Sequence, residues 1–230
     1  MAPSTINVAG VEEALPADKS KTAEASMKHA IEVLYAPDFE SKTGSWKLEC
    51  SADGITVHSK DLEAGRYYAG RCIMPLKPKE QIDQVWDHLE EEPSWNENIK
   101  EAKRLHQLTP YTDIVRYASN KAMMVDSREF VAARVLRQID GAWILTGRSI
   151  SLPDEIPELK GTVRGYLHMG AGRCAPNPAD ADSCIYDYVV CMDLKGMLFK
   201  SVINTVMGKL TMKDISEIRK HTTELKNARK

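Results

Sequence analysis

Residues 183–227, SCIYDYVVCMDLKGMLFKSVINTVMGKLTMKDISEIRKHTTELKN, join two segments with different hydrophobic periods. The first segment, SCIYDYVVCMDL, is rich in aromatic and β-branched side chains and indicates a strand. From about residue 198 to 227 the period becomes that of an amphipathic helix. Apolar residues share one face of this helix: Phe199, Val202, Ile203, Val206, Met207 and Leu210. We therefore expect the chain to end on a strand followed by one long helix.

Upstream of this segment, most of the chain consists of short runs with the two-residue period of strands. These runs cover residues 46–51, 54–60, 67–75, 99–108, 112–119, 129–138, 142–151 and 161–174. Asp53-Gly54 and Asp140-Gly141 stand between neighbouring runs, and Asp-Gly is a strong signal for a tight hairpin turn. Because short connections favour antiparallel neighbours, the runs predict one consecutive antiparallel series.

Two shorter helices and a polar leader complete the organisation. Residues 25–34 have a helical pattern that stops before Pro37, since the residue preceding a proline disfavours helical backbone. Residues 78–89 also carry apolar side chains at helical spacing. Residues 1–25 are small, polar and acidic, which is typical of a flexible arm. We expect such an arm, followed by one domain over residues 26–230.

The predicted elements define a fold class. A large antiparallel sheet has to bury one of its faces, and the long C-terminal helix is the available cover. If the helix lies across a curved sheet without filling its concave side, an apolar tunnel remains. The sequence therefore predicts an α+β fold, in which a curved antiparallel sheet is covered by a long C-terminal helix around a hydrophobic tunnel.

The composition bounds the partners of the protein. The 230 residues are 43% apolar and carry a net charge of −2, which gives no general attraction to nucleic acid. The charge is uneven, because residues 194–230 hold nine Lys/Arg against three Asp/Glu. This basic segment favours transient contact with anionic membranes. No apolar stretch approaches the ~18 residues that a membrane span needs.

The sequence contains no motif for catalysis or metal binding. We find no GxSxG, no HExxH and no phosphate-binding loop. The cysteines form no CxxC and no Cys/His ligand spacing, and their odd number without an apolar leader indicates reduced thiols in a cytoplasmic protein. They are Cys50, Cys72, Cys174, Cys184 and Cys191. We expect no enzymatic activity, no cofactor and no metal.

Four segments carry a more specific signal. They are WNENIKE at 95–101, SREFVAAR at 127–134, KGTVRGYLHMGAG at 160–172 and DLKGMLFKSVINTVM at 193–207. In order and spacing they resemble the START domain family (steroidogenic acute regulatory protein-related lipid transfer). The resemblance covers roughly residues 46–226, and it is closest to the small, single-domain cytosolic members.

The resemblance implies a helix-grip fold and a soluble carrier that encloses one lipid and exchanges it with membranes. The implied ligand is a sterol-like lipid such as cholesterol, while a bile acid, a carotenoid or a phospholipid are the alternatives. A helix-grip enzyme and a membrane-tethering adaptor are two further classes. We expect a monomeric, cytoplasmic carrier whose partners are its lipid and anionic membranes, with no nucleic acid.

Arg134 is the main candidate for a polar ligand contact. It alternates with Phe130 and Ala132 on one strand face, so an arginine has apolar neighbours. The resemblance implies that this arginine points into the cavity; the alternative is that it faces solvent. Family members usually pair it with a carboxylate on the preceding strand, whereas residues 114–119, IVRYAS, contain no acid. Without an internal counter-ion, a ligand carboxylate or phosphate is favoured.

Other candidates are polar strand residues and the apolar face of the last helix. Tyr166 and His168 share a strand face and could reach the ligand, although a hydrogen bond to a neighbouring backbone carbonyl is the favoured account of the histidine. Tyr186 and Tyr188 could form a wall with polar tips or simply pack in the core. The remaining predicted ligand contacts are Tyr117, Ser119, Ser149, Phe199, Val202, Ile203 and Val206.

Entry of a lipid into an enclosed tunnel requires a cover that opens at the membrane. Met123 and Met124 lie in a predicted loop, NKAMMVDS, and exposed methionines pack adaptably against lipid. The start of the last helix adds Met197, Leu198 and Lys200. We expect these five residues to contact the membrane; the alternative for the two loop methionines is that they cap the core.

Overall fold

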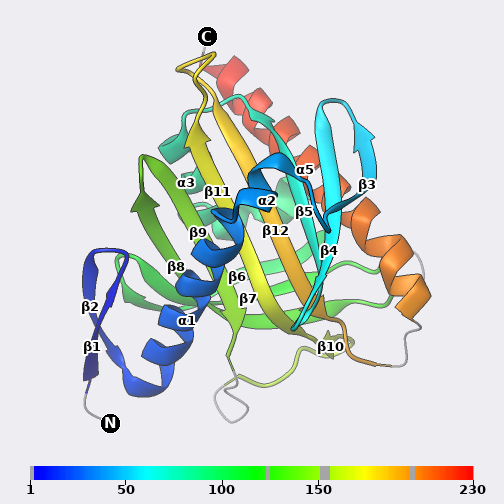
Figure 1. Ribbon diagram of the computed structural model, residues 1–230. Coiled ribbons are helices and arrows are strands. Elements are labelled where there is room, and N and C mark those ends of the chain that lie inside the picture. The colour runs from blue at the N-terminus through cyan, green and yellow to red at the C-terminus, as the bar shows by residue number, and fades with distance from the viewer. Residues whose placement is uncertain (1–2, 123–124, 151–155, 197–199, 230) are drawn as a thin grey trace.

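The computed structural model describes residues 3–122, 125–150, 156–196 and 200–229. It contains one strongly bent antiparallel sheet with a helix on each face (Figure 1). Helix α1 (Ala17–Leu34) crosses one face, and the long helix α5 (Lys200–Ala228) lies against the other. The expected α+β helix-grip architecture is confirmed.

The sheet has the strand order β3-β4-β5-β12-β11-β9-β8-β7-β6. Its strands are β3 (Lys47–Ala52), β4 (Ile55–Leu62), β5 (Gly65–Met74), β6 (Ile99–Thr109), β7 (Thr112–Ser119), β8 (Arg128–Ile139), β9 (Ala142–Ser149), β11 (Tyr166–Pro176) and β12 (Cys184–Asp193). A short strand β10 (Val163–Arg164) pairs with β8 in parallel. The predicted turns at Asp53-Gly54 and Asp140-Gly141 both have positive φ, as tight hairpins require.

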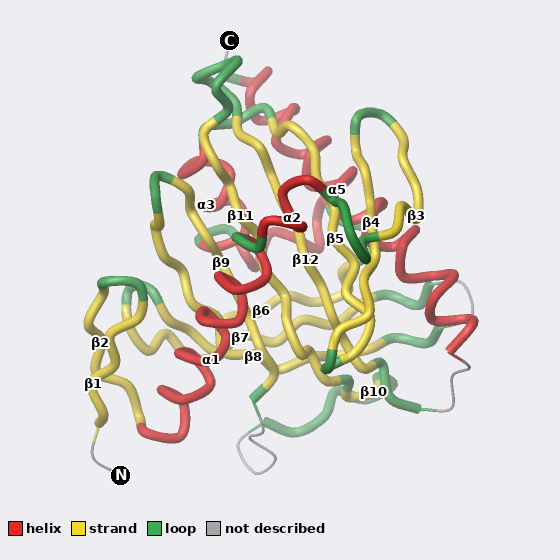
Figure 2. Tube along the Cα trace, viewed as in Figure 1, coloured by secondary structure: helices red, strands yellow, loops and turns green. Residues whose placement is uncertain are grey.

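The expectation of one consecutive series is wrong at a single point. Strand β5 pairs with β12, which comes last in the chain, and β6 forms the far edge of the sheet. The segment between β5 and β6 holds α3 (Pro78–Trp86), a 3-10 turn η1 (Leu89–Glu91) and α4 (Glu92–Trp95). This helical segment carries the chain from the middle of the sheet to its opposite edge, as Figure 2 shows.

The two faces of the sheet follow the side-chain alternation of its strands. On β5, Tyr67 and Ala69 belong to the buried cluster that includes α1 residues such as Met27. Tyr68 belongs to a cluster with Met207 of α5, and Cys72 to one with Ile215 of the same helix. Successive residues of one strand therefore build two separate cores, one under each helix.

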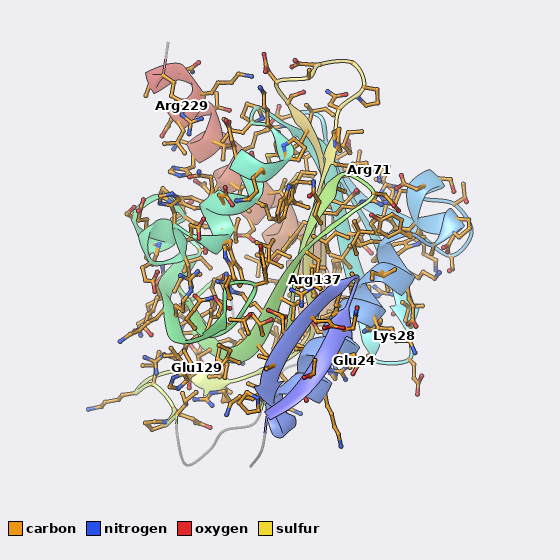
Figure 3. All side chains as sticks on the ribbon, turned by 90° about the vertical axis from the view of Figure 1, so that its left-hand side faces the viewer. Glu24, Lys28, Arg71, Glu129, Arg137 and Arg229 are labelled. Atoms are coloured by element: carbon orange, nitrogen blue, oxygen red, sulfur yellow. The ribbon has the colours of Figure 1, made fainter. Side chains whose placement is uncertain are left out.

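The N-terminal residues differ from the expected flexible arm. Strands β1 (Pro3–Val8) and β2 (Val11–Pro16) form a hairpin, and α1 begins at Ala17. Arg137 of β8 is 1% exposed, donates to the Val8 carbonyl at 2.8 Å and pairs with Glu13. Figure 3 shows this arginine next to the hairpin. The polar composition predicted a flexible arm because it does not show that Glu13 pairs with a buried arginine.

Helix α1 is also longer than its predicted range of 25–34, for a simple reason. Its fully buried apolar residues are Ala23, Met27, Ala30 and Leu34, and the two alanines among them give only a weak hydrophobic signal. A short helix α2 (Pro37–Ser41) follows after Ala36. No helix in the described part of the chain combines the length and the apolar character needed to cross a membrane.

Candidate ligand-binding site

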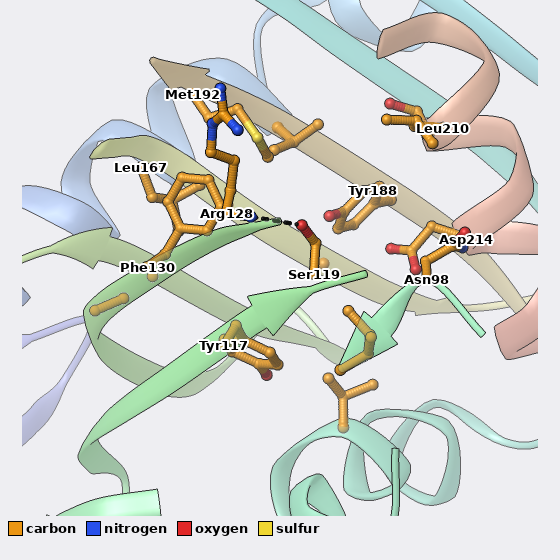
Figure 4. A pocket seen from close by; sticks show the side chains of 18 of the residues that line it. Asn98, Tyr117, Ser119, Arg128, Phe130, Leu167, Tyr188, Met192, Leu210 and Asp214 are labelled. Atoms are coloured by element: carbon orange, nitrogen blue, oxygen red, sulfur yellow. Dashed lines mark hydrogen bonds between the residues drawn. The ribbon is translucent and has the colours of Figure 1, made fainter. Parts of the chain in front are cut away.

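A cavity of about 260 Å³ lies between α5 and the sheet. Side chains enter it from the strands, from α3 and α4, and from α5; Figure 4 shows Tyr117, Phe130, Tyr188, Leu210 and Asp214 around it. The apolar part of its lining is Ile82, Val85, Ile99, Ala122, Val125, Phe130, Ala132, Leu145, Leu167, Ala171, Val190, Met192, Leu194, Met207, Leu210 and Ile218. Most of the wall is therefore suited to hydrocarbon.

Glycines on the central strands keep this space open. Gly147 of β9 and Gly170 and Gly172 of β11 line the cavity. A Cβ atom at Gly172 would lie 3.3 Å from the Tyr186 ring and hydroxyl. A Cβ atom at Gly170 would lie 3.2 Å from Leu167. The absence of side chains at these positions leaves room for the aromatic and aliphatic walls.

Arg134 lines the cavity and is paired with an aspartate. Its Nε donates to Oδ1 of Asp113 at 2.9 Å, and its Nη2 donates to Oδ2 at 2.6 Å. Its Nη1 donates to the Val85 carbonyl at 2.9 Å and to the Tyr117 hydroxyl at 3.1 Å. The guanidinium also lies 4.8 Å from the centre of the Trp86 ring. Arg134 is 3% exposed, so the charge is buried but compensated.

This ion pair corrects the expectation that Arg134 lacks an internal counter-ion. Asp113 lies directly opposite Arg134 in the β7–β8 register, one residue before the stretch 114–119 that contains no acid. This register cannot be derived from the spacing of the two strands alone. Arg104 of β6 also donates to Asp113, at 2.9 Å. Because the carboxylate is already inside the protein, the case for an anionic ligand group at Arg134 is lost.

Four of the other predicted contacts line the cavity as well. Burial raises the pKa of Tyr117, Tyr186 and Tyr188, so these hydroxyls stay neutral. Ser119 accepts a hydrogen bond from the backbone N–H of Arg128 at 3.1 Å (Figure 4). Whether these residues bind a ligand stays a prediction.

Tyr166, His168 and Ser149 are outside the cavity lining. A bulge between Leu167 and Met169 reverses the alternation of β11, so that Leu167 and Gly170 line the cavity instead. Tyr166 and His168 pack edge to face, with ring centres 4.8 Å apart. Ser149 accepts a hydrogen bond from the Leu167 N–H at 2.9 Å. A period-two pattern cannot reveal such a bulge.

Among the described side chains of α5, the cavity lining begins at Met207, one turn after the predicted Ile203. Val206 is buried against a cluster with Tyr68 and Met207, and Ile203 packs at its edge. Neither belongs to the cavity lining, which α5 supplies from Met207, Leu210, Thr211, Asp214 and Ile218. Phe199 and the side chain of Val202 lie outside the described residues.

The predicted membrane contacts also fall outside the description. Met123, Met124, Met197, Leu198 and the side chain of Lys200 are not among the described parts of the structure. Their described neighbours Ala122, Val125 and Leu194 line the cavity. The proposed entry loop is thus flanked in sequence by cavity residues, and Leu194 lies three residues before Met197.

Sequence reasoning missed a group of polar residues in the cavity. Glu92 of α4, Thr211 and Asp214 of α5, and Asn98 all belong to the lining. Burial and then the charge of Asp214 raise the pKa of Glu92 to about 8, and burial raises the pKa of Asp214. Asp214 could have been found, because it continues the apolar face of α5 at helical spacing. Glu92 stands in an acidic run and gives no such signal.

The described residues contain no cluster of three or more His, Cys, Asp or Glu side chains arranged for a metal ion. Among the residues that line the cavity in the described structure, the charged ones are Glu92, Asp126, Arg128, Arg134 and Asp214. The site therefore offers apolar contacts and hydrogen bonds.

Comparison with known proteins agrees with this geometry. The model of the START domain matches residues 36–228. The chain is 34% identical to steroidogenic acute regulatory-like protein 1 of Caenorhabditis elegans over 86% of this chain and 77% of that protein. It is 28% identical to the steroidogenic acute regulatory protein of Xenopus laevis over 90% and 72%. Human StAR-related lipid transfer protein 5 has a similar fold, with a TM-score of 0.77 and 20% identity over 90% of this chain and 99% of that one. This chain belongs to the START domain family.

Proposed function

We propose that the protein is a carrier that encloses one sterol-like lipid in this cavity and transfers it between membranes. Membership of the START domain family supports a lipid-binding carrier role. The names of its relatives, which refer to steroidogenic regulation and lipid transfer, favour a sterol among the possible lipids. Cholesterol is the simplest ligand of this class.

The observation that carries the proposal is the combination of an apolar cavity with a charge-balanced polar group. Arg134 is held by Asp113, and the Tyr117 hydroxyl accepts one of its hydrogen bonds. Because its charges are balanced, a group of this kind does not attract an anion, and the cavity as a whole suits a neutral lipid. A sterol has one hydroxyl at the end of a rigid apolar body, whereas a bile acid or a phospholipid brings an anion that finds no free cation at Arg134.

The cavity is small for a sterol, which supports a proposal that it widens when a lipid is loaded. About 260 Å³ is slightly less than the roughly 300–1,000 Å³ of common ligand pockets. We propose that a sterol enters while the protein touches a bilayer, through the loop of Met123 and Met124 and the start of α5. Exposure to water would cost the lipid about 0.8 kcal/mol per CH₂ group, which makes entry from bulk water slow.

We also propose that the protein acts as a cytoplasmic monomer without enzymatic activity. Its five cysteines are free, which suits a reducing compartment. A carrier releases the lipid that it took up, so the lipid recovered after transfer should be chemically unchanged.

A binding and transfer assay tests the proposal. The probes are dehydroergosterol, a bile acid and a phosphatidylcholine, each offered in liposomes. We expect saturable one-to-one binding of dehydroergosterol and faster transfer to acceptor liposomes with the protein than without it. Absence of saturable sterol binding would remove the sterol-carrier function.

A further inference from the structure

The cavity holds a second polar cluster, separate from the Arg134–Asp113 pair. Glu92 of α4 and Asn96, the residue that follows this helix, form one side of the cluster. Thr211 and Asp214, which lie one turn apart on α5, form the other side. Glu92 is 6% exposed, Thr211 2% and Asn96 0%. Two elements distant in the sequence thus bring polar side chains into one buried place.

Asn96 fixes the geometry of this cluster. Its Nδ2 donates to Oδ1 of Asp214 at 2.8 Å and lies 3.5 Å from Oε1 of Glu92. Its Oδ1 accepts a hydrogen bond from the backbone N–H of Asn98 at 3.1 Å. Asn96 therefore links the two carboxyl groups. Because its amide nitrogen and oxygen both have hydrogen-bond partners, neither atom is available to a ligand.

Two atoms in the cluster have no hydrogen-bond partner in the described structure. They are Oε2 of Glu92 and the hydroxyl oxygen of Thr211. Both residues line the cavity, and both atoms are buried. Buried polar atoms are almost always hydrogen-bonded in native proteins, and an unmet one destabilises the fold. Two residues of the cavity wall therefore each carry a buried polar atom that lacks a partner and that a bound ligand could pair with.

The charges around Glu92 decide which ligand group fits. Asp214 faces it from α5, Arg134 from β8, and the tyrosines Tyr117 and Tyr188 from β7 and β12. Arg134 is committed to Asp113, so two carboxyl groups in a buried place favour the protonated form of Glu92. A protonated carboxyl and a threonine hydroxyl can each donate and accept, while a ligand carboxylate would meet a nearby acid.

We propose that Glu92 and Thr211 are ligand-binding residues that hydrogen-bond an uncharged hydroxyl group of the lipid and select against lipids with a carboxylate. This inference rests on the proposed function and adds the residues that determine specificity within it. Asp214 and Asn96 act as positioning residues, because they hold Glu92 through hydrogen bonds and charge.

Matched variants at both positions test the inference. Glu92→Leu and Thr211→Val remove the hydrogen-bonding groups, whereas Glu92→Gln and Thr211→Ser retain them. Glu91→Leu, at an exposed neighbouring position, is the surface control. The probes are dehydroergosterol, its 3-methyl ether and a bile-acid carboxylate, each titrated by fluorescence or by displacement of dehydroergosterol.

We expect Glu92→Leu and Thr211→Val each to weaken dehydroergosterol binding by about five- to tenfold, the effect of one neutral hydrogen bond. Their preference for the alcohol over the ether should fall by a similar factor. Glu92→Gln and Thr211→Ser should weaken binding clearly less than the apolar variants, and Glu91→Leu should bind within about twofold of the wild type. The empty Thr211→Val protein should melt no lower than the wild type, which confirms that it folds.

The outcomes separate the inference from the function. If the wild type binds dehydroergosterol but both apolar variants bind it equally well, with the same preference over the ether, this inference is overturned and the carrier function stands. If the wild type prefers the bile-acid carboxylate, the selectivity is overturned. If the wild type binds no sterol, the sterol-carrier function and the inference both fail.

Discussion

Helices α1 and α5 cover the two faces of one sheet, with opposite results. Helix α1 packs through Ala23, Met27, Ala30 and Leu34, all 0% exposed, and it belongs to a continuous core. Helix α5 presents Thr211 and Asp214 within its inner face and leaves a cavity in front of glycines of the sheet. The comparison shows that side chains fill the space on one face of the sheet, whereas the other face keeps a cavity.

The largest effect should come from the buried ion pair at the cavity. Asp113→Leu leaves Arg134 buried without its carboxylate, and such a loss costs about 3–5 kcal/mol of folding free energy. Urea unfolding of the variant measures it. The double variant Asp113→Leu/Arg134→Leu should recover most of the stability, since an apolar pair replaces the charges. A double variant as unstable as the single one would contradict this account.

A pair of leucine truncations compares the two faces directly. Leu34→Ala on α1 should cost about 2–5 kcal/mol, because it creates a cavity in a closed core. Leu210→Ala on α5 should cost clearly less, because its side chain already borders empty space. Sterol affinity should change in the opposite order. Equal losses of stability, measured by urea unfolding, would show that the two faces are packed alike.

Glu92 should make the cavity face sensitive to pH. Its pKa is about 8 in the folded protein against an ordinary value of 4.5, so the folded state binds the proton more tightly. The stability that the proton contributes is complete below about pH 4.5 and is lost as the pH rises to about 8. Between pH 5 and 8 the wild type should lose about 3–4 kcal/mol relative to Glu92→Gln. Parallel stability curves for the two proteins would place the pKa of Glu92 near its ordinary value.

The smallest effect concerns the outer side of α5. Lys209 is exposed, and one lysine near an anionic membrane contributes about 1 kcal/mol to binding. Lys209→Gln should therefore slow sterol transfer on anionic liposomes by up to about fivefold, with equilibrium affinity unchanged. Transfer on neutral liposomes is the control. A loss of the same size on neutral liposomes would rule out an electrostatic origin.

The fold could be predicted from the sequence because its signals are local. The Asp-Gly turns, the alternating runs and the apolar face of α5 each depend on neighbouring residues. The N-terminal hairpin could not, because its anchor joins Glu13 to Arg137 across most of the chain. The pairing of β5 with β12 is non-local for the same reason.

The site was predicted in part, and the limits were set by register. The family resemblance pointed to Arg134 and to Tyr117 on the preceding strand, and both line the cavity. The partner Asp113 depends on the exact β7–β8 pairing, and the exclusion of His168 depends on a bulge. Glu92 lies in the cavity wall only because α4 packs near α5 in the folded protein, and no local sequence pattern predicts that packing.

Native mass spectrometry tests the central claim most directly. The protein is incubated with an equimolar mixture of cholesterol, a bile acid and a phosphatidylcholine in liposomes, separated from them and weighed intact. The account predicts one bound cholesterol per chain, released chemically unchanged. A protein occupied by the bile acid or the phospholipid, or one that carries no lipid, would contradict it.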